Sequence, residues 1–184
     1  MEGPESEPPL EVPWQDADGR FVDLRENPAA VREIEPGRHM PLGRFLAAVN
    51  SADSVFNSVK CKARAGEGGA DAGAEEAHGF SSEVALVYAQ EGLNGKRANY
   101  EGLAQQLVEL LSRDAPADAL SAELNVRPCR FGEQRHEGYC LRIVLQARGS
   151  TAEQAEVRWG LGLARVQQAL LYLSRVIRHQ TAGD

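Results

Sequence analysis

Alternating apolar and polar residues predict four β-strands in this chain. Three segments show the alternation, and one is an almost continuous apolar run of the kind found in a buried strand. A flexible acidic insert over residues 65–79 joins the first two strands and a short turn joins the last two, so each pair is expected to form a hairpin. The predicted strands span residues 55–64, 83–89, 122–127 and 139–147.

Apolar residues at helical spacing predict three helices. The first spans residues 41–50, and the second spans about 99–113 with Asn99 as its N-terminal cap. The third begins at a capping box, Ser150-x-x-Glu153, and runs to about His179. One face of this long helix carries an apolar stripe made of Trp159, Leu163, Val166, Leu170, Leu173 and Ile177.

The order of these elements predicts an α+β fold. We expect a four-stranded antiparallel sheet with the helices on one face, ferredoxin-like in its ordinary or a permuted strand order, and a long C-terminal helix. In a chain of 184 residues, a single domain over residues 41–179 is the expected organisation. Residues 1–40 are predicted to be an acidic, proline-rich tail that is extended or disordered, and residues 180–184 a disordered end.

The last helix is predicted to be longer than the sheet beneath it. A ten-residue strand spans about 33 Å, whereas about 29 helical residues span about 43 Å. About two helical turns would then project beyond the sheet. Leu173 and Ile177 would be exposed there unless something covered them. Two covers are equally consistent with the sequence, residues 14–24 folded back over the helix or a second protein chain.

Charge is unevenly distributed along the chain. Residues 1–40 carry −6 of the formal net charge of −7 and the insert a further −4, so the remainder is weakly basic at +3. Basic residues gather on the two predicted hairpins, where they indicate either RNA contact or lysine protection of an edge strand. The candidate RNA-binding residues are Lys60, Lys62, Arg64, Arg127, Arg130 and Arg142.

The sequence also bears on compartment. It contains no apolar run of about 20 residues, the length that spans a bilayer, and no secretory signal at its N-terminus. Cys61, Cys129 and Cys140 form no C-x-x-C pair. Cys129 and Cys140 are symmetric about the second hairpin turn, yet free thiols are the expectation. We therefore expect a soluble intracellular protein in a reducing compartment, whether cytoplasm, nucleus or organelle.

The turn after the second strand is the one place where the sequence suggests a ligand. Free backbone N–H groups, the positive end of a helix dipole and two cations meet there, and together they suit a phosphate or carboxylate. The alternative is a structural turn, in which the two glycines permit positive φ and Asn94 can cap the turn. The candidate anion-binding residues are Gly92, Asn94, Gly95, Lys96 and Arg97.

The same turn, Ala89-Gln90-Glu91-Gly92-Leu93-Asn94-Gly95, resembles the Ala-x-Glu-Gly-(Ile/Val/Leu)-Asn-Gly signature in the N-terminal domain of the rhodanese-related tRNA uridine hydroxylase family. The resemblance covers residues 82–147 and implies an acylphosphatase-like, ferredoxin-like domain. The chain departs from the family at Lys96, where the family has Thr or Ser, and in having only a helix after Cys140 in place of the catalytic rhodanese domain. The resemblance thus implies an accessory domain without its catalyst.

No arrangement of residues predicts a metal site, a cofactor or a catalytic centre. The first hypothesis is therefore a non-catalytic adaptor or subunit that binds a protein partner, or a second copy of itself, through the stripe on the last helix. The second is an RNA-associated accessory domain that uses the basic hairpins. The third is an acylphosphatase-like hydrolase, with Arg97 binding the anion and Asn94 orienting water.

Overall fold

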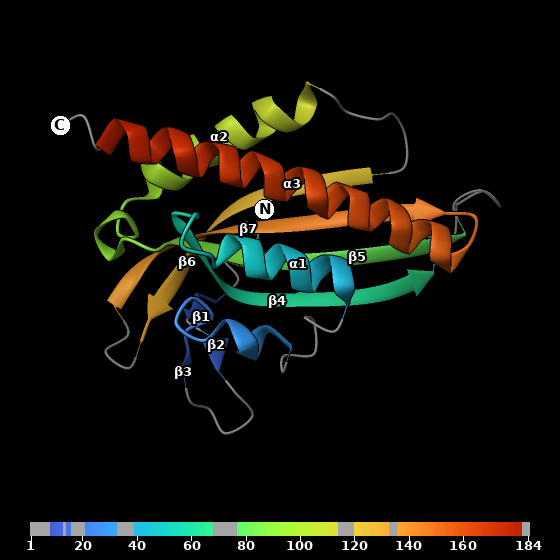
Figure 1. Cartoon of the computed structure of the whole chain (residues 1–184), viewed down its shortest axis with the longest axis horizontal. Helices are drawn as coiled ribbons and strands as arrows, with labels where there is room; N and C mark the ends of the chain where they lie inside the picture. Colours follow the sequence, from blue (N-terminus) through green and yellow to red (C-terminus); the bar gives the residue numbers. More distant parts are fainter. Residues whose placement is uncertain are drawn as a thin grey trace, which may run out of the picture.

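In the computed structural model, three α-helices pack on one face of a curled β-sheet (Figure 1). The structure describes residues 8–12, 14–15, 21–32, 39–67, 77–113, 120–132 and 136–181. The helices are α1 (Met40–Val49), α2 (Arg97–Ser112) and α3 (Ala152–Thr181), with short 3-10 helices η1 (Pro28–Arg32) and η4 (Glu91–Leu93). The strands are β1 (Leu10–Val12), β2 (Trp14–Gln15), β3 (Phe21–Val22), β4 (Phe56–Glu67), β5 (His78–Tyr88), β6 (Leu120–Phe131) and β7 (His136–Gly149).

Five of these strands form one mixed sheet, in the order β1-β6-β7-β5-β4, which curls into a half-barrel (Figure 1). β4 to β7 pair antiparallel throughout, as the two predicted hairpins joined by β5 and β7. β1 adds in parallel to the outer edge of β6, with Leu10 opposite Cys129. The predicted α+β class and long C-terminal helix are confirmed. The predicted four-stranded antiparallel, ferredoxin-like sheet is wrong, because β1 joins it as a fifth and parallel strand.

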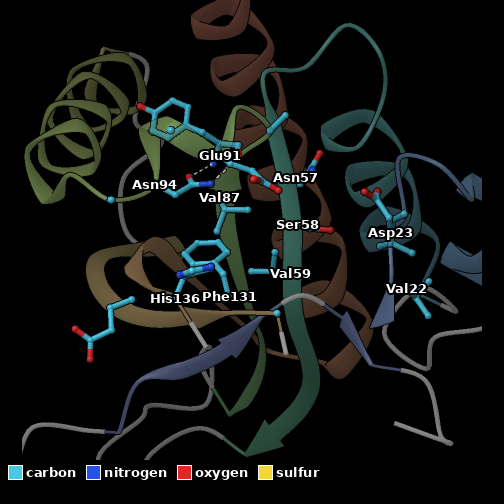
Figure 2. Close-up of a pocket in the computed structure, with 17 residues that line it drawn as sticks. Val22, Asp23, Asn57, Ser58, Val59, Val87, Glu91, Asn94, Phe131 and His136 are labelled. Atoms are coloured by element: carbon cyan, nitrogen blue, oxygen red, sulfur yellow. Dashed lines mark hydrogen bonds between the residues drawn. The ribbon is translucent and has the colours of Figure 1, made fainter. Parts of the chain in front are cut away.

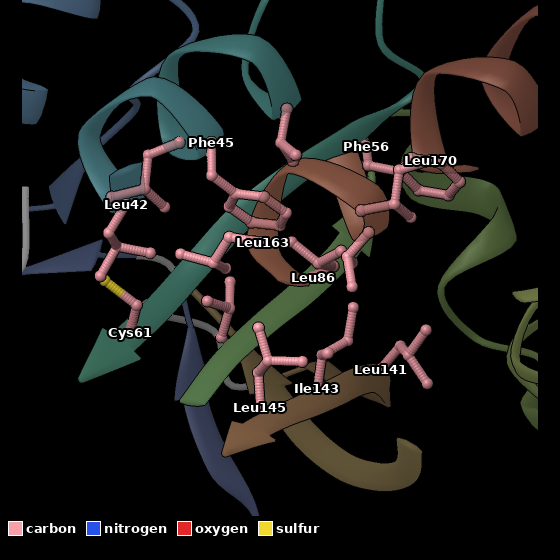
Figure 3. Packing of buried hydrophobic residues seen from close by; sticks show 14 of the residues in the cluster. Leu42, Phe45, Phe56, Cys61, Leu86, Leu141, Ile143, Leu145, Leu163 and Leu170 are labelled. Carbon is pink, nitrogen blue, oxygen red and sulfur yellow. The ribbon is translucent and has the colours of Figure 1, made fainter. Parts of the chain in front are cut away.

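Alternation along the strands gives the sheet two different faces. On the helix face, Leu86, Ile143 and their neighbours join the main core with the apolar sides of α1 and α3 (Figure 3). The opposite face, called the outer face below, carries a smaller apolar cluster. This outer cluster consists of Val12, Val59, Ala85, Val87, Cys129 and Cys140.

Residues 21–32, called the strap below, hold the N-terminal segment against the body of the protein. Leu24, Ala30 and Val31 are buried in the main core. The guanidinium of Arg25 donates hydrogen bonds to Asn57 Oδ1 (2.8 Å) and to the carbonyl oxygens of residues 54 and 56 (2.8 and 3.0 Å). Part of the segment predicted as a tail therefore supplies both a strand and core side chains.

The predicted overhang of the last helix is wrong. β7 has 14 residues and spans about 46 Å, which matches about 45 Å for the 30 residues of α3. The strands are longer than predicted, so the sheet reaches as far as the helix. Five members of the stripe are buried, and Ile177 packs partly buried against the same core. The protein's own chain covers the stripe, so in this fold it offers no free docking surface; the five buried residues are Trp159, Leu163, Val166, Leu170 and Leu173.

Two predicted helix caps are displaced. Asn99 lies inside α2, which begins at Arg97, and its Nδ2 donates to the Leu93 carbonyl (2.8 Å). At α3 the cap is Thr151, one residue later than predicted, and its Oγ1 accepts a hydrogen bond from the N–H of Gln154 (3.1 Å). The reciprocal half of a capping box is displaced, because Gln154 Oε1 accepts from the N–H of Ser150 (2.7 Å) and not from that of the cap.

The predicted insert at 65–79 is shorter than expected. β4 continues to Glu67 and β5 begins at His78, with these two residues paired at the end of the hairpin. Residues 68–76, which make up the rest of the insert, lie outside the described residues, as do residues 182–184 of the predicted disordered end.

Candidate functional site

The turn between β5 and α2 is fixed by Asn94, which is buried. Its Oδ1 accepts hydrogen bonds from the Tyr88 N–H (2.9 Å) and from the Tyr100 hydroxyl (2.5 Å), and its Nδ2 donates to the Tyr88 carbonyl (3.0 Å). The carbonyl of Asn94 in turn accepts from the N–H of Tyr139 on β7 (2.9 Å). The Asn94 side chain thus imitates a strand partner for the end of β5, and these bonds occupy both of its polar atoms.

The other candidate anion ligands in this turn do not converge. Gly92 and Gly95 do not adopt the positive φ that glycine permits; among the described glycines only Gly132 does, at 62°. Arg97 is exposed and forms an ion pair with Glu101 one helical turn later (2.8 Å). Lys96 occupies the N-cap position of α2 without a side-chain capping bond.

A pocket of about 810 Å³ lies beside this turn, between the sheet and the strap (Figure 2). Four segments far apart in the sequence line it: the strap, the start of β4, the end of β5 with the turn that follows it, and the tip of the β6–β7 hairpin. Val59 and Val87 of the outer cluster, together with Phe131, form its apolar base. Gly138, near the hairpin tip, lets β7 approach the turn closely, since a Cβ there would lie 2.9 Å from the Asn94 carbonyl oxygen.

The rim of the pocket is acidic. Asp23 from the strap, Glu91 from the turn and Glu137 from β7 line it and are exposed, accompanied by His136. Neither Lys96 nor Arg97 is among the lining residues. The chemistry around this cavity is therefore opposite to that expected for an anion site.

The outer face of the sheet gathers most of the predicted RNA-binding residues. Side chains alternate between the two faces of a strand, and five of the six fall on the outer face. Each of the five either adjoins a strand residue that points to the helices or pairs with a member of the outer cluster on the next strand. The five are Lys60, Lys62, Arg64, Arg127 and Arg142. Arg130 follows Cys129 on the opposite face and forms an ion pair with Glu11 (3.8 Å).

Arg142 on this face is already paired. Its guanidinium donates to Glu83 Oε2 (2.9 Å), and both side chains are about three-quarters buried. This hydrogen bond from Arg142 lowers the pKa of Glu83, although burial acts in the opposite direction. The pair leaves the Nε of Arg142 buried without a hydrogen-bond partner.

Sequence reasoning missed the residues that make the pocket. Val22, Asp23 and Leu24 fall in the segment 14–24, which was predicted only as a possible cover for the last helix, and Phe131 and His136 fall in the second predicted hairpin, outside the candidate anion site. The available signal was the isolated apolar group around Leu24 in a polar segment, which indicates a contact with the body of the protein. Its position over the end of β5 follows only from tertiary structure.

Two further observations limit the chemistry of the described residues. They contain no group of three or more His, Cys, Asp or Glu side chains placed to hold a metal ion. None of their helices has the length and apolar character needed to cross a membrane. Comparison of the chain with family models, curated proteins and solved structures finds no match, so the resemblance to the hydroxylase family stays a prediction.

Proposed function

We propose that this chain is a non-catalytic binding domain whose site is the pocket between the strap and the sheet. The observation that carries the proposal is a cavity of about 810 Å³ with an apolar base and a rim bearing three carboxylates. Small organic ligands occupy cavities of roughly 300–1,000 Å³, with an apolar lining and a few polar groups that fix orientation. The pocket has that size and composition.

The charge of the rim selects the ligand class. Asp23, Glu91 and Glu137 line the pocket from three separate segments of the chain. A ligand with an apolar body and a protonated amine would bury the body against Phe131 and Val87 and place the amine among the carboxylates. A carboxylate or phosphate ligand would be repelled.

Isothermal titration with three matched probes tests this proposal. Phenethylamine, 2-phenylethanol and 3-phenylpropionate share an apolar body and differ in charge. We expect saturable binding of the amine, at least about tenfold tighter than that of the carboxylate, which corresponds to about 1.4 kcal/mol. A double variant Glu91→Gln, Glu137→Gln should lose this preference, while Lys96→Ala, outside the pocket, should keep it. Equal binding of amine and carboxylate, or no saturable binding, would contradict the proposal.

The predicted role as an adaptor fits the same chemistry. A lysine side chain of a partner protein carries a protonated amine on an apolar stem, as the small-molecule probe does. Titration with an acetylated peptide that has lysine between two phenylalanines distinguishes a partner protein from a free small molecule as the source of the amine. Binding tighter than that of phenethylamine favours a protein partner, and weaker binding favours a free small molecule.

RNA binding is a second candidate, supported by the five cations on the outer face. A triple variant Lys60→Ala, Lys62→Ala, Arg64→Ala should weaken binding of a single-stranded oligonucleotide and reduce the slope of log K against log salt by about 2. Arg130→Ala, on the other face, is the matched control. An unchanged slope in the triple variant would remove this candidate. The hydrolase hypothesis gains no support, since Arg97 is paired with Glu101 and the Asn94 side chain is occupied.

A further inference from the structure

Two of the three cysteines lie side by side on the outer face. The register of the second hairpin puts Cys129 opposite Gly138 and Cys140 opposite Arg127, so the two side chains are diagonal neighbours on adjacent strands. Both are buried, with at most 1% of their surface exposed, and both belong to the outer cluster. Both side chains therefore lie on the same face and within the same cluster. Diagonal neighbours of this kind are roughly 7–8 Å apart between Cα atoms, so closing a disulfide there requires a small local movement of the two strands toward each other.

The surroundings make the two thiols unequal. The hydrogen bond from Cys129 and the positive charges of Arg127 and Arg142 lower the pKa of Cys140, although burial and the carboxylate of Glu83 act against them. The same hydrogen bond, together with burial, raises the pKa of Cys129. Cys140 therefore has the character of an attacking thiolate, since the thiolate is the reactive form, and Cys129 that of the thiol that resolves the product.

Cys61 provides a contrast within the same chain. It lies on the helix face of β4 in the main core, on the side of the sheet opposite to the pair. Burial raises the pKa of its thiol to about 12. A buried thiol of this kind is inert.

Two features of the fold border the pair, the pocket on one side and a short edge strand on the other. Val59, Val87 and Phe131, which pack in or against the outer cluster, also line the pocket. At the edge of the sheet, β1 has three residues and covers Cys129 through Leu10 and Val12. A strand this short at a sheet edge opens more easily than the sheet as a whole.

We propose that Cys129 and Cys140 form a redox site that closes to an intramolecular disulfide on exposure to a hydroperoxide. The Cys140 thiolate attacks one peroxide oxygen, the O–O bond breaks, and with one proton the products are a sulfenic acid and water, or an alcohol from an organic peroxide. The Cys129 thiol then attacks the sulfenic sulfur and releases water. The two thiols together lose two electrons, which the peroxide gains. A thiol reductant restores both by exchange. This site is independent of the ligand proposed for the pocket.

Mass spectrometry of the full-length protein tests the proposal. Protein treated with hydrogen peroxide is unfolded in the presence of N-ethylmaleimide, which labels every remaining thiol. We expect a single label, on Cys61. After the mass of that label is subtracted, the oxidised protein should be about 2 Da lighter than the reduced protein. Addition of dithiothreitol before labelling should return three labels. Three labels after peroxide, or a bridge that includes Cys61, would overturn the proposal.

Variants separate the pair from its surroundings. After oxidation, Cys61→Ala should take up no label, because its two remaining thiols form the bridge. Cys129→Ala and Cys140→Ala each lack one partner, so neither should form an internal bridge. The wild-type result stands by itself if a variant fails to fold. Substitution of Arg127 by Gln should slow the closing of the bridge without preventing it, because Arg127 lowers the pKa of Cys140. An unchanged rate would contradict the assignment of Cys140 as the attacking thiol.

Discussion

At the scale of single residues, Asn94 contributes more to stability than its position in a turn indicates. Its side chain satisfies the N–H and carbonyl of Tyr88 and the hydroxyl of Tyr100, all of them buried. Asn94→Ala removes all three of these bonds and leaves the Tyr88 N–H and the Tyr100 hydroxyl only the longer bond between them (3.3 Å), so we expect the free energy of unfolding to fall by about 2–4 kcal/mol. Urea unfolding followed by circular dichroism measures this change.

Asn99→Ala is the matched control for that experiment. It removes one hydrogen bond, to the carbonyl of Leu93, at a half-buried position five residues along the chain. We expect a loss of about 0.5–1 kcal/mol. Equal effects of the two substitutions would show that the bonds of Asn94 do not hold the turn.

The Glu83–Arg142 ion pair should make stability depend on acid pH. The folded state lowers the pKa of Glu83, chiefly through the hydrogen bond from Arg142, below the value of about 4.3 typical of an unfolded chain. The pair therefore stabilises the protein fully above that value, and its contribution disappears as the pH falls through the pKa of the folded state. We expect wild type to exceed Glu83→Gln by about 1 kcal/mol at pH 6 and the difference to shrink below about pH 4.

Thermal unfolding of both proteins from pH 6 to pH 3 measures this difference. Glu123→Gln removes a carboxylate from the same face and controls for the change in net charge. A difference between wild type and Glu83→Gln that stays constant over the whole range would rule out the ion pair as its source.

At the scale of elements, the contact between β7 and the β5–α2 turn depends on Gly138. A Cβ at this position would lie 2.6 Å from a ring carbon of Phe131 and 2.9 Å from the carbonyl oxygen of Asn94. The backbone oxygen cannot move without breaking its hydrogen bond with Tyr139 (2.9 Å). We expect Gly138→Ala to cost about 1–3 kcal/mol of unfolding free energy and to distort the pocket.

Gly95→Ala is the comparison for this prediction. Gly95 lies in the same turn, its φ is not positive and a Cβ there would meet nothing within 4 Å. We expect an effect within about 0.5 kcal/mol, measured by the same urea titration. The reverse order of the two effects would mean that the glycines of the turn, rather than Gly138, set its conformation.

The elements differ in how far sequence alone predicts them. The stripe of α3 and the alternation in β7 extend over many residues, so the hydrophobic period identifies both. β1 has three residues and its pairing with β6 spans more than a hundred positions, so no local pattern indicates it. Strand ends were predicted too short because the pattern weakens at Gly66 and Pro128, although hydrogen bonding continues through both segments.

At the scale of the whole molecule, the site depends on long-range packing. The turn after β5 borders the pocket, with Gly92, Asn94 and Gly95 among the lining residues. The sign of its charge was not predictable, because Asp23 and Glu137 reach it from segments more than a hundred residues apart. A sequence window that contains Lys96 and Arg97 shows cations beside the turn, whereas the folded chain turns a different set of side chains toward the cavity.

The length match between α3 and the sheet leads to a last prediction. Leu170 is completely buried against the main core, whereas Tyr172, two residues later, is 54% exposed. Leu170→Glu places a charge in the core, so we expect it to reduce the free energy of unfolding by at least about 3–5 kcal/mol. Tyr172→Glu should change it by about 0.5 kcal/mol or less. Urea unfolding and sedimentation velocity on both variants distinguish a core role from a docking role. If the stripe of α3 instead formed an interface between chains, Leu170→Glu would separate an assembly into smaller, still folded particles, and this result would contradict the burial of the stripe within one chain.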